Sequence, residues 1–271
     1  MLTFDFMQRA MIAAVIVGLI APLIGIFLVQ RRLALLGDGM GHVALTGVGL
    51  AFLLGTAPIP TAMVTAVIGA VLVEYIRFKS RVAGDLALAL LFYGGIAGGV
   101  LFASLAPGRA TSSLNSYLFG SLSTVATTDL ITLGVLAVAV VVVIAIFGRE
   151  LFAVSLDADI ASVQGIRTRA MTTLLAVLAA VTVVVGMRVV GLLLVSAIMI
   201  VPVAAAQQVS RSFRGTGVLA VILGVLAATL GLTTSYYIEV PPGPTIVLIA
   251  LACFIVLAVV AVFIRRRSID A

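Results

Sequence analysis

The chain's single histidine, His42, follows Asp38 by four residues, at the start of an apolar stretch that predicts a helix. Residues i and i+4 of a helix lie on the same face, one turn apart. A carboxylate and an imidazole presented together make half of a site for a divalent metal ion. Two chains meeting around a central axis would supply two Asp and two His ligands, a set that suits zinc, manganese or ferrous iron.

The same two residues also have a purely structural interpretation. Asp is a favoured N-cap residue, so Asp38 would cap the helix while His42 formed an internal hydrogen bond. The residue types alone leave both interpretations open.

The sequence argues against catalysis by this chain. Its one lysine, Lys79, lies in RFKSR without the glycine-rich lead-in of a phosphate-binding loop. A single histidine inside an apolar run also leaves no credible Ser-His-acid triad. We therefore expect no enzyme and no permanently bound cofactor, and the energy for any active transport has to come from a partner protein or an ion gradient.

Composition indicates the environment in which these residues work. Of 271 residues, 63% are hydrophobic and 10% are charged, whereas soluble domains carry about 25% charged residues. A chain of this size cannot hide so much apolar surface from water, so the lipid bilayer has to cover much of it. The 16 basic residues lie in short clusters between apolar runs, which indicates membrane topology and not binding of nucleic acid.

Apolar runs of about 20 residues predict an all-α bundle of eight or nine membrane-spanning helices. Several joints between the runs are tight, so eight spans with one re-entrant segment is an alternative to nine. The runs lie near 10–30, 40–57, 59–77, 86–106, 129–147, 170–188, 189–208, 217–237 and 244–264.

The positions of the basic residues predict the orientation of the bundle. With nine spans, thirteen of the 16 fall on one side of the membrane, and only Arg9, Arg109 and Arg188 fall on the other. Basic residues favour the cytoplasmic side. This predicts a multi-pass protein of the cell membrane with its C-terminus in the cytoplasm and its N-terminus outside.

No polar stretch is long enough for a second domain, so residues 1–271 form one transmembrane domain. The stretch 107–128 predicts an external loop or a short interfacial helix. The stretch 148–169 is expected in the cytoplasm, where Ile160, Val163 and Ile166 recur at helical spacing among polar residues. A short amphipathic helix there would suit docking of another subunit, although an ordinary connecting loop is the alternative.

Four motifs in order resemble the ABC transporter permease family that imports zinc, manganese or iron. The first is RRLALLGDGMGHVALTGVGLAFLLG at 31–55, with its Gly-Asp-small-apolar-small-His segment. The others are VSLDADIASVQGIRTR at 154–169, GLLLVSAIMIVPVAAA at 191–206 and EVPPGPTIVL at 239–248. Within the first motif, Gly39, Gly41 and Thr46 depart from the Ala, Ser and Pro that the family favours at these places.

The resemblance implies a fold like that of type II ABC importer permeases, with Asp38 and His42 as metal ligands on the translocation path. It implies a coupling helix near 155–167 that sits on a cytosolic ABC ATPase. It also implies an extracytoplasmic metal-binding protein and a second permease subunit, which we expect to be an identical copy. The residues expected to contact the ATPase are Asp157, Ile160, Ala161, Val163 and Gly165.

Pro202 lies inside an apolar run and removes one backbone hydrogen bond from the predicted helix. The resulting kink would serve either as a hinge during transport or as a static bend for packing.

Two rival functions fit the same composition. One is a permease for a bulky metal chelate, such as a siderophore or corrin, which needs a wide path and no direct metal ligands. The other is a gradient-driven carrier, which the scarcity of acidic residues within the apolar runs disfavours. The favoured hypothesis remains import of a divalent metal ion, with zinc and manganese preferred as cargo.

Overall fold

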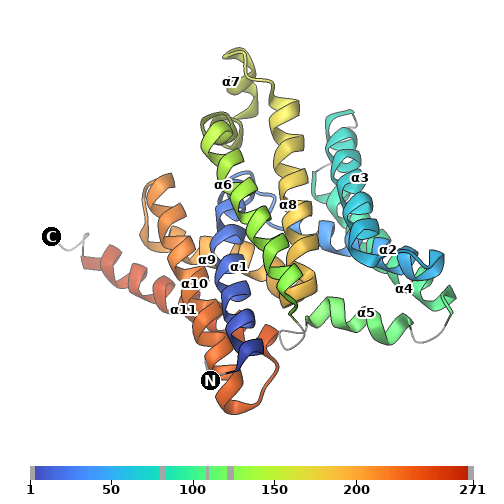
Figure 1. Ribbon diagram of the computed structural model, residues 1–271. Helices are drawn as coiled ribbons and strands as arrows, with labels where there is room; N and C mark the ends of the chain where they lie inside the picture. The colour runs from blue at the N-terminus through green and yellow to red at the C-terminus, as the bar shows by residue number, and fades with distance from the viewer. Residues whose placement is uncertain (1–3, 80–83, 108–109, 121–124, 268–271) are drawn as a thin grey trace.

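The computed structural model describes residues 4–79, 84–107, 110–120 and 125–267, and this part of the chain is helical with short connections. Figure 1 shows the arrangement of the helices. They are α1 (Asp5–Gln30), α2 (Leu36–Leu54), α3 (Pro58–Lys79), α4 (Gly84–Leu105), α5 (Ala110–Phe119), α6 (Thr127–Leu156), α7 (Ala158–Val163), α8 (Thr168–Val190), α9 (Leu192–Val209), α10 (Phe213–Ile238) and α11 (Pro242–Arg267).

Within the described ranges, nine helices are long and apolar enough to cross a membrane. This confirms the all-α bundle and favours the nine-span prediction over the eight-span one. The two remaining helices, α5 and α7, lie in the polar stretches 107–128 and 148–169. Arg81 and Arg109, which contributed to the predicted orientation, lie outside the described residues.

Several hydroxyl side chains in the spans donate hydrogen bonds to carbonyls of their own helices. Ser155 Oγ donates to Leu151 O over 2.6 Å, and Thr233 Oγ1 donates to Thr229 O over 2.7 Å. In lipid no water is present to accept these bonds, so local back-bonding makes such residues tolerable in a spanning helix.

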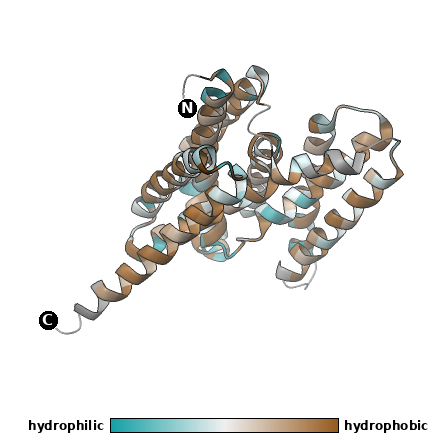
Figure 2. Ribbon diagram, turned by 90° about the horizontal axis from the view of Figure 1, so that it is seen from below, coloured by the Kyte–Doolittle hydropathy of each residue, from teal (hydrophilic) through white to brown (hydrophobic). Residues whose placement is uncertain are grey.

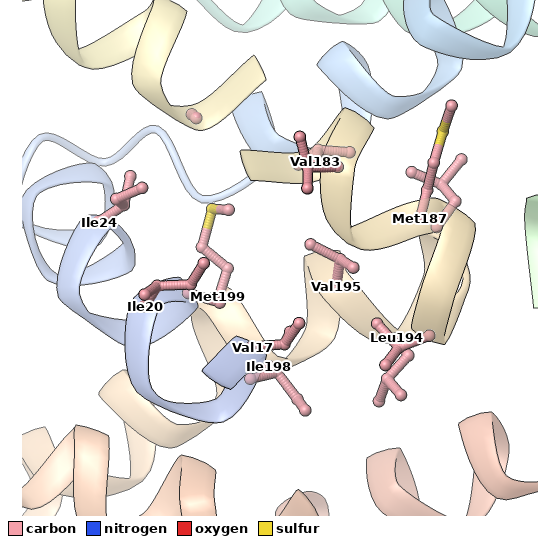
Figure 3. Packing of buried hydrophobic residues seen from close by; sticks show 14 of the residues in the cluster. Val17, Ile20, Ile24, Val183, Met187, Leu194, Val195, Ile198 and Met199 are labelled. Carbon is pink, nitrogen blue, oxygen red and sulfur yellow. The ribbon is translucent and has the colours of Figure 1, made fainter. Parts of the chain in front are cut away.

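The core lies where α1, α8 and α9 meet. Figure 3 shows side chains from all three helices in this region, including Ile20 and Ile24 of α1, Met187 of α8 and Ile198 of α9. Each of these four is at most 1% exposed. The outer helices α6 and α11 instead expose branched apolar side chains such as Val135 and Ile255, and in Figure 2 the C-terminal helix is coloured largely as hydrophobic. Apolar side chains on the outside are what a lipid solvent requires.

Glycines bring α2 close to its neighbours. A Cβ on Gly95 of α4 would lie 2.6 Å from the carbonyl carbon of His42, and one on Gly99 would lie 3.1 Å from that of Leu45. Gly94 has no neighbouring atom within this range. The GGIAGG segment therefore serves helix packing, and it packs α4 against the helix that carries His42.

Candidate metal site and docking helix

Asp38 and His42 lie on one face of α2, as their spacing predicted. The helix begins at Leu36, four residues before the predicted start at residue 40, so Asp38 belongs to its first turn and His42 to its second. Asp38 Oδ1 lies 3.8 Å from His42 Nε2. This distance is too long for a hydrogen bond, but short enough for both atoms to share one ion.

The structural interpretation of the pair does not fit the geometry. The N-cap residue of α2 is Leu35, and no side chain caps this helix end. His42 is 7% exposed, and its buried Nδ1 has no hydrogen-bond partner within the described part of the chain. A buried polar atom without a partner is costly, so the imidazole is not explained by internal hydrogen bonding.

Helix α4 forms one wall beside the histidine. The rings of His42 and Phe92 meet edge to face, with centroids 4.4 Å apart. Thr46 Oγ1 donates to Gly95 O over 2.8 Å, which ties α2 to α4 one turn beyond the histidine. Phe92 was missed by the sequence analysis, because it lies 50 positions after His42 and no local spacing indicates the contact.

Helix α9 forms a second wall at the start of α2. A Cβ on Gly37 would lie 3.1 Å from Met199 Sδ, and one on Gly41 would meet the Leu192 side chain. Pro202 is buried in the same helix, three residues after Met199. A change of bend at Pro202 would therefore act on a segment that contacts α2 directly beside Asp38.

One chain supplies only part of a coordination sphere. No cluster of three or more His, Cys, Asp or Glu side chains exists among the described residues. Asp38 keeps its side chain 28% exposed while that of His42 is 9% exposed, so the carboxylate is the more accessible of the two. The arrangement offers one oxygen and one nitrogen donor, which is fewer than a complete metal site requires.

Helix α7 lies at one end of the bundle, close to the end of α6 and the start of α8 (Figure 1). It covers Ala158–Val163, so it is shorter than the predicted 155–167 segment, and Ile166 lies beyond its end. Asp157 Oδ1 caps it by accepting from the backbone N–H groups of Asp159 and Ile160 over 2.9 and 3.0 Å. Gly165 ends the motif with φ +82°, a conformation that favours glycine.

The side chains of α7 divide into a buried and an exposed set. Ala161 is 1% exposed, whereas Ile160 is 59% and Val163 is 87% exposed. Of the five predicted docking residues, Ala161 therefore fixes α7 to the bundle, Asp157 and Gly165 define its ends, and Ile160 and Val163 are free for contact.

A second ion pair, between the Asp129 carboxylate and the Arg188 guanidinium, was not predicted from the sequence. Asp129 Oδ1 lies 3.0 Å from Arg188 Nε, and its Oδ2 accepts from the backbone N–H of Ala126 over 3.1 Å. The pair joins the start of α6 to the end of α8. Fifty-nine positions separate the two residues, so no local spacing could have indicated the contact.

Close to this pair in the sequence of α8, the backbone at the end of α5 closely approaches the backbone at the junction of α8 and α9. Gly120 and Gly191 have φ values of +73° and +89°, and a Cβ on Gly191 would lie 2.4 Å from the carbonyl carbon of Phe119. Only glycine fits both the dihedral angles and the space.

Comparison with known proteins places this geometry in a family. Residues 3–261 match the model of the ABC 3 transport family. The chain is 33% identical to the manganese import system permease protein ScaB of Streptococcus parasanguinis over 254 residues, covering 93% of this chain and 90% of the relative. It is 28% identical to the high-affinity zinc uptake system membrane protein ZnuB of Haemophilus influenzae, covering 97% and 99%.

A solved structure agrees with these sequence relatives. A chain of PsaBC from Streptococcus pneumoniae in complex with Fab superposes with a TM-score of 0.83 at 31% identity, covering 94% of this chain and 91% of that one. The match of family model, sequence and fold over almost the whole length leaves one assignment: the chain is a multi-pass membrane protein of the ABC 3 transport family.

Proposed function

We propose that this chain is the membrane-spanning subunit of an ABC importer that passes a divalent transition metal ion, manganese or zinc, into the cytoplasm. The observation that carries the proposal is the Asp38–His42 pair on α2, with a buried imidazole nitrogen that has no hydrogen-bond partner among the described residues. Manganese and zinc are the ions named for the similar permeases ScaB and ZnuB. The metal is transported cargo and not a resident cofactor.

The metal site is completed by a second permease subunit, an identical copy of this chain. Each copy contributes one carboxylate and one imidazole, so a dimer with α2 near its axis supplies a four-ligand set of nitrogen and oxygen donors. Such a set suits either ion, and neither the number nor the type of the side chains selects between manganese and zinc.

A separate cytosolic ABC ATPase supplies the energy and docks on α7. Support comes from the exposed Ile160 and Val163 on a helix that Ala161 anchors and Asp157 caps. Because Asp157 caps α7 and the buried Ala161 anchors it to the bundle, α7 moves as one unit. A displacement of α7 by the ATPase is therefore passed on to α6 and α8. Pro202 in α9 is the hinge that lets the wall beside Asp38 change its bend.

The orientation follows the charge distribution along the chain. The positive-inside bias, with most basic residues on the side of α7 in the nine-span arrangement, supports a cytoplasmic location of α7 and of the C-terminus. The opposite end, with α5 and the Asp129–Arg188 pair, faces outward and receives metal from an extracytoplasmic binding protein.

The test is ATP-dependent uptake of radiolabelled manganese and zinc by vesicles that contain this chain with its ATPase and binding protein. Saturable uptake of one ion is expected, and Asp38→Asn should abolish it, because the amide loses the charge while keeping the size. The matched control is Asp5→Asn, an exposed acid in the first turn of α1, which should leave uptake unchanged. Full uptake by Asp38→Asn would reject the pair as ligands and favour a chelate as cargo, and uptake without ATP would reject the ATPase.

A further inference from the structure

A pocket opens between the end of α3 and the beginning of α8, at the end of the bundle where α7 lies. Its volume is about 380 Å³. Residues of the last turns of α3 and the first two turns of α8 line it: Val71, Glu74, Tyr75, Phe78, Lys79, Arg169, Thr172 and Thr173. None of them takes part in the proposed metal site or in the exposed face of α7.

Two cations contact aromatic residues at this pocket, one at a ring face and one at a ring hydroxyl. The guanidinium carbon of Arg169 lies 3.6 Å from the centroid of the Phe78 ring. Lys79 Nζ donates to Tyr75 Oη over 3.1 Å and lies 5.5 Å from the centroid of that ring. Stacking orients the Arg169 guanidinium, and the hydrogen bond to Tyr75 orients the Lys79 ammonium; both contacts leave most of the N–H donors available to an anion.

The one acid that lines the pocket, Glu74, has its negative charge balanced by an ion pair. Glu74 is buried and forms an ion pair with Arg77. Arg31, which precedes α2, interacts electrostatically with both groups. Burial is the largest influence on its guanidinium and lowers the pKa, whereas the negative charge of Glu74 acts in the opposite direction. Glu74 thus interacts with Arg77 and Arg31, while Lys79 and Arg169 on the pocket lining form no ion pair with an acid of the described residues.

The backbone adds to this positive field. No side chain caps the start of α8, and its first turn carries Arg169 on the pocket wall. The N–H groups at a helix start attract anions. This concentration of positive charge suits a phosphate or another anion of similar size.

An apolar stripe leads away from the pocket along α3. Val64, Ile68, Val71 and Tyr75 recur at spacings of four, three and four residues, and their exposures are 58%, 54%, 44% and 58%. This spacing keeps them on one helix face, over a length of about 16 Å at 1.5 Å per residue. The anion site and the apolar stripe together match a molecule that has a charged head and a long hydrocarbon chain.

We propose that the α3–α8 pocket binds an anionic glycerophospholipid, with its phosphate beside Arg169 and Lys79 and one acyl chain along the stripe of α3. Basic pockets between helices at the membrane surface suit such headgroups, and a tyrosine near the end of a spanning helix, such as Tyr75 in α3, is typical of the membrane interface. The bound lipid bridges α3 to α8 directly beside α7, so it holds the helix that follows the docking element.

The test is native mass spectrometry of the full chain purified in detergent and titrated with phosphatidylglycerol or phosphatidylcholine. Wild type should retain phosphatidylglycerol more tightly than phosphatidylcholine. Arg169→Gln and Lys79→Gln should each weaken phosphatidylglycerol binding about fivefold, with phosphatidylcholine binding unchanged. The matched control is Arg149→Gln, an exposed arginine of α6 away from the pocket, which should bind like wild type.

Competition separates the lipid from a free anion. Inorganic phosphate and glycerol 3-phosphate, which lack acyl chains, should displace phosphatidylglycerol poorly. Displacement at equal concentration would show a free-phosphate site and overturn the proposal. Equal losses of phosphatidylglycerol binding in Arg169→Gln and Arg149→Gln would overturn it as well. So would an Arg169→Gln variant that still prefers phosphatidylglycerol to phosphatidylcholine but copurifies with less ATPase or less of a second copy of the chain, because the pocket would then bind a protein. None of these readouts depends on metal transport.

Discussion

Asp38 and Asp129 each face a basic side chain, but the two pairs differ in how fully their polar atoms are hydrogen-bonded. Asp129 is 8% exposed, and both of its oxygens are occupied, one by Arg188 and one by the backbone of Ala126. Asp38 lies 3.8 Å from a histidine whose other ring nitrogen has no partner in the described structure. A saturated pair holds helices together, whereas an unsaturated pair retains donor atoms for a ligand.

The largest expected difference between the pairs concerns transport. His42→Ala should lower ATP-dependent metal uptake at least about a hundredfold, because changes outside the first ligand shell already cost about 10- to 100-fold. Vesicle uptake measures it, and the purified variant should still fold and melt a few degrees below wild type, since the substitution removes the ring contact with Phe92 but no hydrogen bond of Nδ1 within the described residues. Uptake close to wild type would make the two pairs equivalent and remove the main support for the proposed site.

The response to pH should also separate the pairs. An imidazole has to be neutral to bind a metal, so metal affinity of the purified chain should fall as the pH is lowered from about 8 to about 5. Arginine stays protonated over this range, so the Arg188 charge that faces Asp129 does not change. Equilibrium dialysis against manganese and zinc tests the first statement, and a flat affinity over this range would contradict it.

The walls around His42 offer a more graded test. Gly95→Ala introduces a methyl group 2.6 Å from the carbonyl carbon of His42, and overpacking of this kind costs about 1–3 kcal/mol. We expect uptake to fall roughly tenfold as α2 is displaced from α4. Gly94→Ala is the matched control, because its Cβ would meet no neighbouring atom. Equal uptake by the two variants would show that α2 adjusts freely.

The smallest effect on transport should come from the saturated pair. Asp129→Ala removes a capping contact worth about 1 kcal/mol and an ion pair worth about 0–1 kcal/mol, because Arg188 is half exposed. Thermal unfolding of the purified variant should occur a few degrees lower, while uptake in vesicles stays within about twofold of wild type. Loss of uptake with unchanged melting would assign Asp129 a role in transport and weaken the contrast with Asp38.

How well the sequence predicted this structure depends on whether the information was local. Length and hydropathy located all nine long helices, because lipid enforces both. Helix ends were less predictable: α6 runs to Leu156, nine residues past the predicted end at 147, since Arg149 and Glu150 end an apolar run without ending a helix. Similarly, α2 starts at Leu36 although the polar Gly-Asp-Gly segment lowers its hydropathy.

The candidate site was predicted only as far as one helix turn reaches. The i to i+4 spacing placed Asp38 and His42 on one face of α2, and the structure agrees. The ring of Phe92, the Met199 contact and the Asp129–Arg188 pair come from elements distant in sequence, and no periodicity encodes them. The predicted docking residues of α7 were partly predictable. Their helical spacing was visible in the sequence, but the buried position of Ala161 was not.

Helix α8 connects regions that have so far been treated separately. Its 23 residues contain no proline and span about 35 Å, with α7 joined to one end. The other end carries Arg188, paired to Asp129, and adjoins Gly191, which meets α5 backbone to backbone. Such a helix behaves as a stiff rod fastened at both ends. Because α8 has no proline bend that could absorb a movement, we expect a displacement imposed at α7 to reach the α5 end with comparable size.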